Sequence, residues 1–119
     1  CIDSVKEHGS AITVSPAIET IFLKSGNDNQ VGQIFNRSLC EMAKAPQCFP
    51  LEDIYQCHVK ARTEGLLDFI DSASMMQHYG YSLFTVQGPS ENIKITTPSD
   101  FYIFRAIMDA KESLQILGL

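Results

Sequence analysis

The residues best suited to chemistry lie in the segment 92–100, near the end of the chain. Lys94 stands within the short apolar stretch Ile93-Lys94-Ile95, which predicts a strand, and Thr97 with Pro98 predicts the start of a helix. In an α/β sheet, the end of a strand and the start of the next helix form the usual ligand crevice, where a lysine charge suits phosphate. An edge-strand lysine in water fits the same pattern. Lys94 is therefore a candidate phosphate ligand.

Other catalytic and metal-binding patterns are absent from the sequence. There is no G-x-x-x-x-G-K-[ST], G-x-G-x-x-G, G-x-S-x-G or H-E-x-x-H. The four cysteines form no C-x-x-C pair and lack a histidine at zinc-finger spacing, so we expect free thiols and no metal site. His8, His58 and His78 are scattered, which favours structural or solvent-facing roles. Asp71 precedes a short helical stretch, and its first role is that of an N-cap.

Length and composition favour one compact domain. The chain has 119 residues, of which 45% are hydrophobic and 19% charged, and this suits a single core. A net charge of -5 argues against general nucleic-acid binding, and no apolar run is long enough to span a bilayer. We therefore expect a soluble, cytoplasmic chain with neither a nucleic-acid nor a membrane partner. Its first residues, Cys1 to His8, suggest a helix entered midway and hence a piece of something longer.

Hydrophobic periodicity and breakers predict the elements that position these residues. A strand over 11–15 is followed by a long β-hairpin, Ile18 to Leu39, with its reversal in 25–29. The hairpin is too apolar to stand in water, so either its own domain or another chain must cover it. The remaining predicted elements are helices over 1–8, 51–64 and 72–79, strands over 82–86 and 93–95, and a final helix from Pro98. Their order predicts helices covering a mixed or parallel sheet.

The order of short motifs along nearly the whole chain resembles one enzyme family. This is the family of polyol-phosphate cytidylyltransferases, which act on 2-C-methyl-D-erythritol 4-phosphate or D-ribitol 5-phosphate, and the chain resembles their carboxyl-terminal half. The motif Asn92-Ile93-Lys94-Ile95-Thr96-Thr97-Pro98 is the most specific. The others are Gly9 to Thr13, Glu19-Thr20, Asn36 to Leu39, Ala45 to Phe49, Ile70 to Ala73, Gly80 and Gly88-Pro89.

The resemblance implies a Rossmann-like nucleotidyltransferase fold, part of a three-layer α/β sandwich, with a protruding β-hairpin arm over about 17–44. Such an arm crosses to a partner subunit, so a homodimer is implied. The implied reaction transfers CMP from CTP to a polyol phosphate and releases pyrophosphate. Lys94 would contact the phosphates of CTP, while Thr20 and Arg37 would hold the polyol phosphate in the neighbouring subunit's site. Asp71 would lie near the cleft and contribute to substrate binding.

Several departures from the family pattern limit these expectations. The family's glycine-rich CTP loop and the acidic residue that helps hold Mg²⁺ belong to its amino-terminal half, so we expect the Mg²⁺ ligands outside this chain and the piece alone to be inactive. Ala45 replaces a common threonine, and Asp71-Ser72-Ala73 varies between branches, which leaves open an isoprenoid or a cell-wall polyol role. The alternatives are a non-catalytic dimerisation or interaction domain, or a likeness of fold without the activity.

Overall fold

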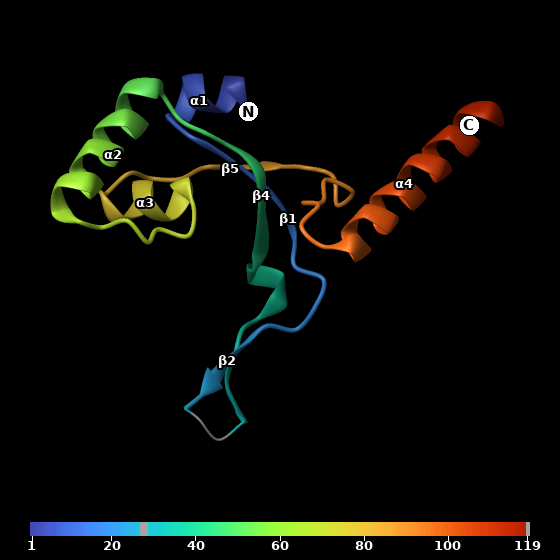
Figure 1. Cartoon of the computed structure of the whole chain (residues 1–119), viewed down its shortest axis with the longest axis horizontal. Helices are drawn as coiled ribbons and strands as arrows, with labels where there is room; N and C mark the ends of the chain where they lie inside the picture. The colour runs from blue at the N-terminus through green and yellow to red at the C-terminus, as the bar shows by residue number, and fades with distance from the viewer. Residues whose placement is uncertain (27–28, 119) are drawn as a thin grey trace. The chain divides into compact units, whose positions relative to one another are not determined.

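The computed structural model describes residues 1–26 and 29–118, in two units, Cys1–Gly88 and Pro89–Leu119. The first unit is a mixed α/β fold, and the second consists of an irregular segment and one long helix. Within the described ranges, no helix has the length and apolar character needed to cross a membrane. The elements, shown in Figure 1, are α1 (Ile2–His8), β1 (Ala11–Pro16), β2 (Phe22–Ser25), β3 (Gln30–Ile34), the 3-10 turn η1 (Arg37–Leu39), β4 (Glu41–Cys48), α2 (Leu51–Glu64), α3 (Ser72–His78), β5 (Thr85–Gln87) and α4 (Pro98–Ile116).

Strand β1 is the centre of a three-stranded sheet in the order β4-β1-β5. It pairs antiparallel with β4 and parallel with β5. Residues 11–15 are all buried, as expected for an apolar strand covered on both faces. Because β1 is enclosed by a strand on each side, it forms the rigid base from which the next segments leave.

Strand β4 was not predicted from the sequence, because Pro46 lies inside it. A proline cannot donate a ladder hydrogen bond, so it argues against a central strand. In the structure, the register of the β1–β4 pair shifts between Ile12 and Val14, whose partners are Gln47 and Ala43. Pro46 falls within this irregular part of the ladder, where its missing N–H disrupts no regular pairing. The bulge therefore lets β4 continue to Cys48.

The predicted hairpin is confirmed in a shorter form, as the separate two-stranded sheet β2-β3. Gly26 and Asn29 have φ angles of 58° and 54°, as a tight reversal requires, while the other predicted turn residues, 27 and 28, lie outside the described residues. The legs of the hairpin come together again where the Phe35 N–H donates to the Ile21 carbonyl at 2.9 Å. Within the described chain its apolar side chains remain uncovered; Ile34, for example, is 62% exposed.

Helices α2 and α3 enclose a small core formed by Cys57, Ala61, Met75 and Met76. Helix α2 has the predicted bounds, and it ends at Gly65, whose φ of 71° lets its N–H cap the carbonyls of Ala61 and Arg62. Burial raises the pKa of the Cys57 thiol, against a smaller opposing effect of Lys60. Cys57 is a free, buried thiol, and a buried thiol of this kind has a packing role.

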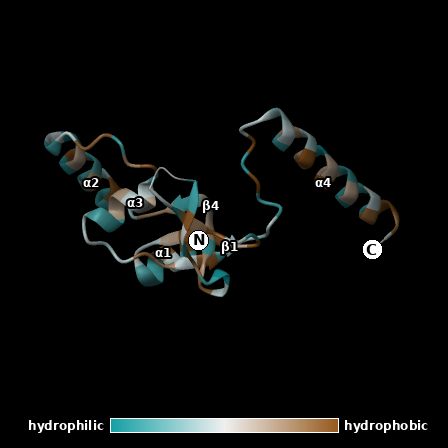
Figure 2. Cartoon of the chain, turned by 90° about the horizontal axis from the view of Figure 1, so that it is seen from below, coloured by the Kyte–Doolittle hydropathy of each residue, from teal (hydrophilic) through white to brown (hydrophobic). Residues whose placement is uncertain are grey.

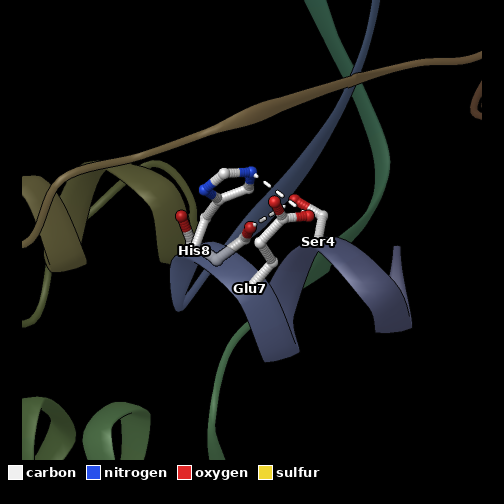
Figure 3. A network of polar contacts seen from close by, with 4 residues as sticks. Ser4, Glu7 and His8 are labelled. Carbon is white, nitrogen blue, oxygen red and sulfur yellow. Dashed lines mark hydrogen bonds and ion pairs between the residues drawn. The ribbon is translucent and has the colours of Figure 1, made fainter.

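Polar contacts of Ser4, Glu7 and His8 lie at the end of α1 (Figure 3). The Ser4 hydroxyl donates to the Ser10 carbonyl at 2.9 Å, and His8 Nε2 lies 3.7 Å from Glu7 Oε2. The His8 ring stacks on Phe84, with centroids 4.6 Å apart. These contacts confirm the structural role expected for His8.

In the second unit, the predicted final helix is confirmed as α4. The Thr97 side chain accepts from the Asp100 N–H, and Asp100 Oδ2 accepts from the N–H groups of Thr96 and Thr97, which forms a capping box. These hydrogen bonds lower the pKa of Asp100 to about 2. The apolar residues of α4, brown in Figure 2, are exposed within the described chain; they include Phe101, Phe104, Met108 and Leu114.

The strand predicted over 93–95 is wrong, because this segment has no regular structure. A strand needs a partner for its backbone groups, and none of the described strands pairs with these residues. Instead the Ile93 N–H bonds back to the Glu91 carbonyl at 2.8 Å. The strand predicted over 82–86 is displaced to β5, Thr85–Gln87. Lys94 is thus exposed in an irregular segment that leads into a capped helix.

Candidate active site

Asp71 is the N-cap of α3, as predicted, and its carboxylate is strongly hydrogen-bonded. Oδ1 accepts from the Ser74 N–H at 2.8 Å and from the Ser74 hydroxyl at 2.6 Å. Oδ2 accepts from Gln47 Nε2 at 3.0 Å. The bonds from Ser74, aided by Gln47, lower the pKa of Asp71, so this group is a fixed anion at neutral pH.

Asp71 lines a cavity of about 640 Å³ beside α2 and α3. Its polar wall includes Asp71, Ser72, His58 and Arg62, and its apolar wall includes Phe69 and Met75. A volume of this size lies within the range of about 300–1,000 Å³ that small-molecule sites occupy. One fixed carboxylate and one guanidinium beside an apolar wall suit a ligand that carries hydroxyl and charged groups. We call this space the Asp71 cavity.

Arg37 lies in a different place, at the base of the hairpin. It begins η1, which Asn36 caps by accepting from the Ser38 N–H at 3.1 Å and the Ser38 hydroxyl at 2.7 Å. Arg37 Nη1 donates to the Ile18 carbonyl at 3.1 Å, which joins the two legs of the hairpin. The side chain is exposed, and a guanidinium has several further N–H donors to offer an anion.

A second cavity of about 640 Å³ surrounds this turn. Arg37, Asn36, Ser38 and Glu41 line it, together with Gln87. Gln87 Nε2 donates to Glu41 Oε2 at 2.6 Å, so the carboxylate already has a partner. Arg37 is the positive group on this wall, and we call the space the Arg37 cavity.

The predicted site residues of the first unit do not form one cluster within this chain. Arg37 and Asp71 line separate cavities that share no lining residue. Thr20 is exposed in the loop before β2 and lines neither cavity. Lys94 belongs to the second unit. Within this chain, Arg37 and Asp71 therefore do not share a site.

Gln47 was not predicted as a site residue, although it belongs to the motif Ala45 to Phe49. It lies near the end of β4 and is half-buried. Its amide bonds Asp71 on one side and the Ala73 N–H on the other, each at 3.0 Å. These partners stand 24 and 26 residues away, and no local pattern links them. The signal for this contact was the pair of motifs, Pro46-Gln47 and Asp71-Ser72-Ala73, taken together.

The described residues do not offer a metal site of their own. In residues 1–26 and 29–118, no three side chains among His, Cys, Asp and Glu lie close enough to hold a metal ion. Asp71 and Glu41 each line a cavity, but neither is grouped with two further metal-binding side chains, and Asp71 already accepts three hydrogen bonds from Ser74 and Gln47. The residues present thus do not fit Mg²⁺, and no step below is assigned to a metal held by them.

Comparison with known proteins identifies the family. Residues 1–110 match the family model of IspD, 2-C-methyl-D-erythritol 4-phosphate cytidylyltransferase. The chain belongs to this cytidylyltransferase family. Its structure also resembles that of 2-C-methyl-D-erythritol 4-phosphate cytidylyltransferase from Thermus thermophilus, with a TM-score of 0.76 and 27% identity over 90% of this chain and 52% of that one.

Curated relatives include both acceptor branches of the cytidylyltransferases. The chain is 50% identical over 117 residues to a ribitol-5-phosphate cytidylyltransferase of Vibrio parahaemolyticus. These residues make up 98% of this chain and 49% of the relative. It is 38% identical over 105 residues to a 2-C-methyl-D-erythritol 4-phosphate cytidylyltransferase of Aquifex aeolicus. The matched residues make up 88% of this chain and 47% of that relative.

These matches confirm the expected fold class, a Rossmann-like nucleotidyltransferase α/β fold with a hairpin. The chain spans about half the length of the curated relatives it matches. They do not support the expectation that this half is the carboxyl-terminal one. Membership of the cytidylyltransferase family does not depend on that placement.

Proposed function

We propose that the protein containing this chain transfers CMP from CTP to a polyol phosphate, with D-ribitol 5-phosphate as the acceptor. The observation that carries the choice of acceptor is the 50% identity to a ribitol-5-phosphate cytidylyltransferase, against 38% to a relative named for the erythritol acceptor. In this reaction an oxygen of the polyol phosphate attacks the α-phosphorus of CTP. The bond from that phosphorus to the bridging oxygen breaks, and pyrophosphate leaves with the electron pair.

The residues of this chain would position the two substrates and neutralise the negative charge of their phosphates. Arg37 can grip the phosphate of the acceptor, because its planar fork matches phosphate oxygens bidentately. The Lys94 ammonium group would stabilise the negative charge on the phosphates of CTP as it develops in the transition state. Asp71 would accept a hydrogen bond from the acceptor. Thr20, on the loop that leads into the hairpin, would add a hydroxyl near the acceptor phosphate.

A homodimer through the hairpin is the second part of the proposal. The exposed apolar residues of β2 and β3 need a cover, and a second copy of the chain supplies one by symmetry. Arg37 stands at the base of this hairpin, in a cavity separate from that of Asp71. In a dimer, the Arg37 side chain of one subunit can serve the Asp71 cavity of its partner. The proposal thus accounts for both the uncovered hairpin and the separated site residues.

Gly32→Ala should weaken the dimer. The backbone at Gly32 has no positive φ, but an added Cβ would lie 2.6 Å from the Leu23 carbonyl oxygen and 3.3 Å from the Ser25 nitrogen. These are backbone atoms, so the two strands must move apart, at a cost of about 1–3 kcal/mol. Sedimentation of the full-length protein should show a dimer that dissociates at higher concentration than the wild type. Gln33→Ala, at the exposed neighbouring position, is the control.

A second variant of the hairpin can contradict the dimer proposal. If Gly32→Ala leaves the dimer unchanged, a second variant replaces Phe22 and Ile34, which pair across the hairpin and are both exposed, with serine. A dimer that survives this double change does not use the hairpin.

Pyrophosphate release by the full-length protein tests the function. We expect rapid release with CTP and D-ribitol 5-phosphate, slower release with 2-C-methyl-D-erythritol 4-phosphate, and none with the 119-residue piece alone. Preference for the erythritol acceptor would assign the protein to isoprenoid precursor synthesis instead of cell-surface polyol synthesis. A dimer without release from any polyol phosphate would favour the non-catalytic interaction domain.

A further inference from the structure

The Gln47 side chain is placed to set the direction of the Asp71 carboxylate. Its Nε2 donates to Asp71 Oδ2 and its Oε1 accepts from the Ala73 N–H, both at 3.0 Å. The two bonds fix the orientation of the amide, because a flipped amide would place its oxygen against the carboxylate and its NH₂ group against an N–H donor. One side chain of β4 therefore holds both the cap residue and the first turn of α3.

The hydrogen bonds of Asp71 leave it with limited remaining capacity. A carboxylate offers about four lone-pair sites. The Ser74 N–H and hydroxyl occupy Oδ1, and Gln47 takes part of Oδ2. What remains is one acceptor position on Oδ2, carried by a residue that lines the Asp71 cavity. An ionised carboxylate with one open position is suited to a neutral hydroxyl donor.

We propose that Gln47 is a positioning residue for acceptor binding, which holds Asp71 so that Oδ2 accepts a hydrogen bond from a hydroxyl group of the polyol phosphate. This inference rests on the proposed cytidylyltransferase function and adds to it a specific contact. The ligand chemistry is a polyhydroxylated chain, recognised through a hydroxyl while its phosphate is held elsewhere. Gln47 itself touches no substrate.

An amide is the group that this position requires. Methionine has a similar length but can neither donate to Asp71 nor accept from Ala73, so the carboxylate would lose its fixed direction. Glutamate keeps an acceptor for Ala73, but when ionised it places a second negative charge beside Asp71. When protonated, it can donate to Asp71 as the amide does. The two substitutions therefore differ in how they depend on pH.

The test uses the full-length protein with Gln47→Met and Gln47→Glu, and Gln77→Met as the control on the exposed face of α3. For Gln47→Met we expect a KM for D-ribitol 5-phosphate about 10-fold above the wild type, because a directed hydrogen bond to a charged group is lost. The KM for CTP should change less than twofold. Gln77→Met should match the wild type in both.

The pH profile separates a positioning role from a merely structural one. In Gln47→Glu the two carboxyl groups share a proton, so one pKa is raised. The ratio of kcat/KM for the acceptor in Gln47→Glu to that in the wild type should rise as the pH falls through the raised pKa, because the protonated Glu side chain can donate to Asp71. Above that pKa the ratio should fall. Because this measurement uses Gln47→Glu, it tests the proposal even if Gln47→Met does not fold. A flat ratio of Gln47→Glu to wild type from about pH 5 to 8 overturns the inference.

Other outcomes also count against the proposal. Equal increases in the KM for CTP and for the acceptor, or an unchanged acceptor KM in Gln47→Met, overturn the role of Gln47 while the function stands. Calorimetric titration with D-ribitol 5-phosphate checks binding independently of turnover. A wild-type protein that neither binds nor converts any polyol phosphate overturns the proposed function, and the inference with it.

Discussion

Arg37→Ala, in the full-length protein, should lower kcat/KM for the polyol phosphate by about 100-fold or more, because a bidentate pair of charge-assisted hydrogen bonds to phosphate is lost. Most of the change should appear in the acceptor KM. Little stability should be lost with it, since the one bond from Nη1 to the Ile18 carbonyl is exposed. Initial rates at varied acceptor and saturating CTP measure the effect.

Arg37→Lys is the matched variant for this prediction. Lysine keeps the positive charge but not the planar fork, so we expect a loss intermediate between wild type and alanine. Both variants should remain dimeric. An acceptor KM that stays within twofold of the wild type in Arg37→Ala would show that Arg37 does not bind the acceptor phosphate.

Lys94→Ala should lower kcat/KM for CTP by about 100-fold, because a positive charge no longer stabilises the phosphates in the transition state. Lys94 is exposed and precedes the capped start of α4, so its removal should leave the fold unchanged. Lys111→Ala, at an exposed position later in α4, should behave as the wild type. Steady-state rates at varied CTP, with thermal unfolding as a check on folding, distinguish the two.

An unchanged rate in Lys94→Ala would leave the lysine as a surface residue. Its exposed side chain would then have no role beyond contact with water. Equal losses in Lys94→Ala and Lys111→Ala would instead indicate a general effect of charge on this part of the molecule.

Local signals in the sequence predicted the elements whose ends are marked by specific residues. Helix α2 has the predicted limits because Gly65 supplies the positive φ that ends it. The start of α4 was predicted because Thr97, Pro98 and Asp100 form a capping arrangement within four residues. Asp71 was predicted as an N-cap because it directly precedes a helical stretch, and its side chain accepts from the nearby Ser74 N–H. In each case, the physical cause lies within one helical turn of its effect.

The features that could not be predicted depend on residues distant in the sequence. Strand β4 was missed because Pro46 is tolerated only through a bulge in its pairing with β1. The strand over 93–95 was wrong because apolar residues alone do not supply a partner strand. The role of Gln47 depends on contacts with residues 71 and 73, which the fold alone brings near. Within the first unit, the separation of Arg37 from Asp71 was likewise invisible in the sequence.

A mixed dimer tests the central claim that two copies of the chain build each site. Subunits carrying Arg37→Ala are combined with subunits carrying Lys94→Ala, each nearly inactive alone. If the hairpin arginine serves the partner's site, every mixed dimer has one intact site, and an equal mixture that exchanges freely regains about a quarter of the wild-type rate. If Arg37 and Lys94 act within one subunit, the mixture stays as inactive as its components. The account predicts recovery, and its absence in a mixture shown to contain mixed dimers would contradict the account.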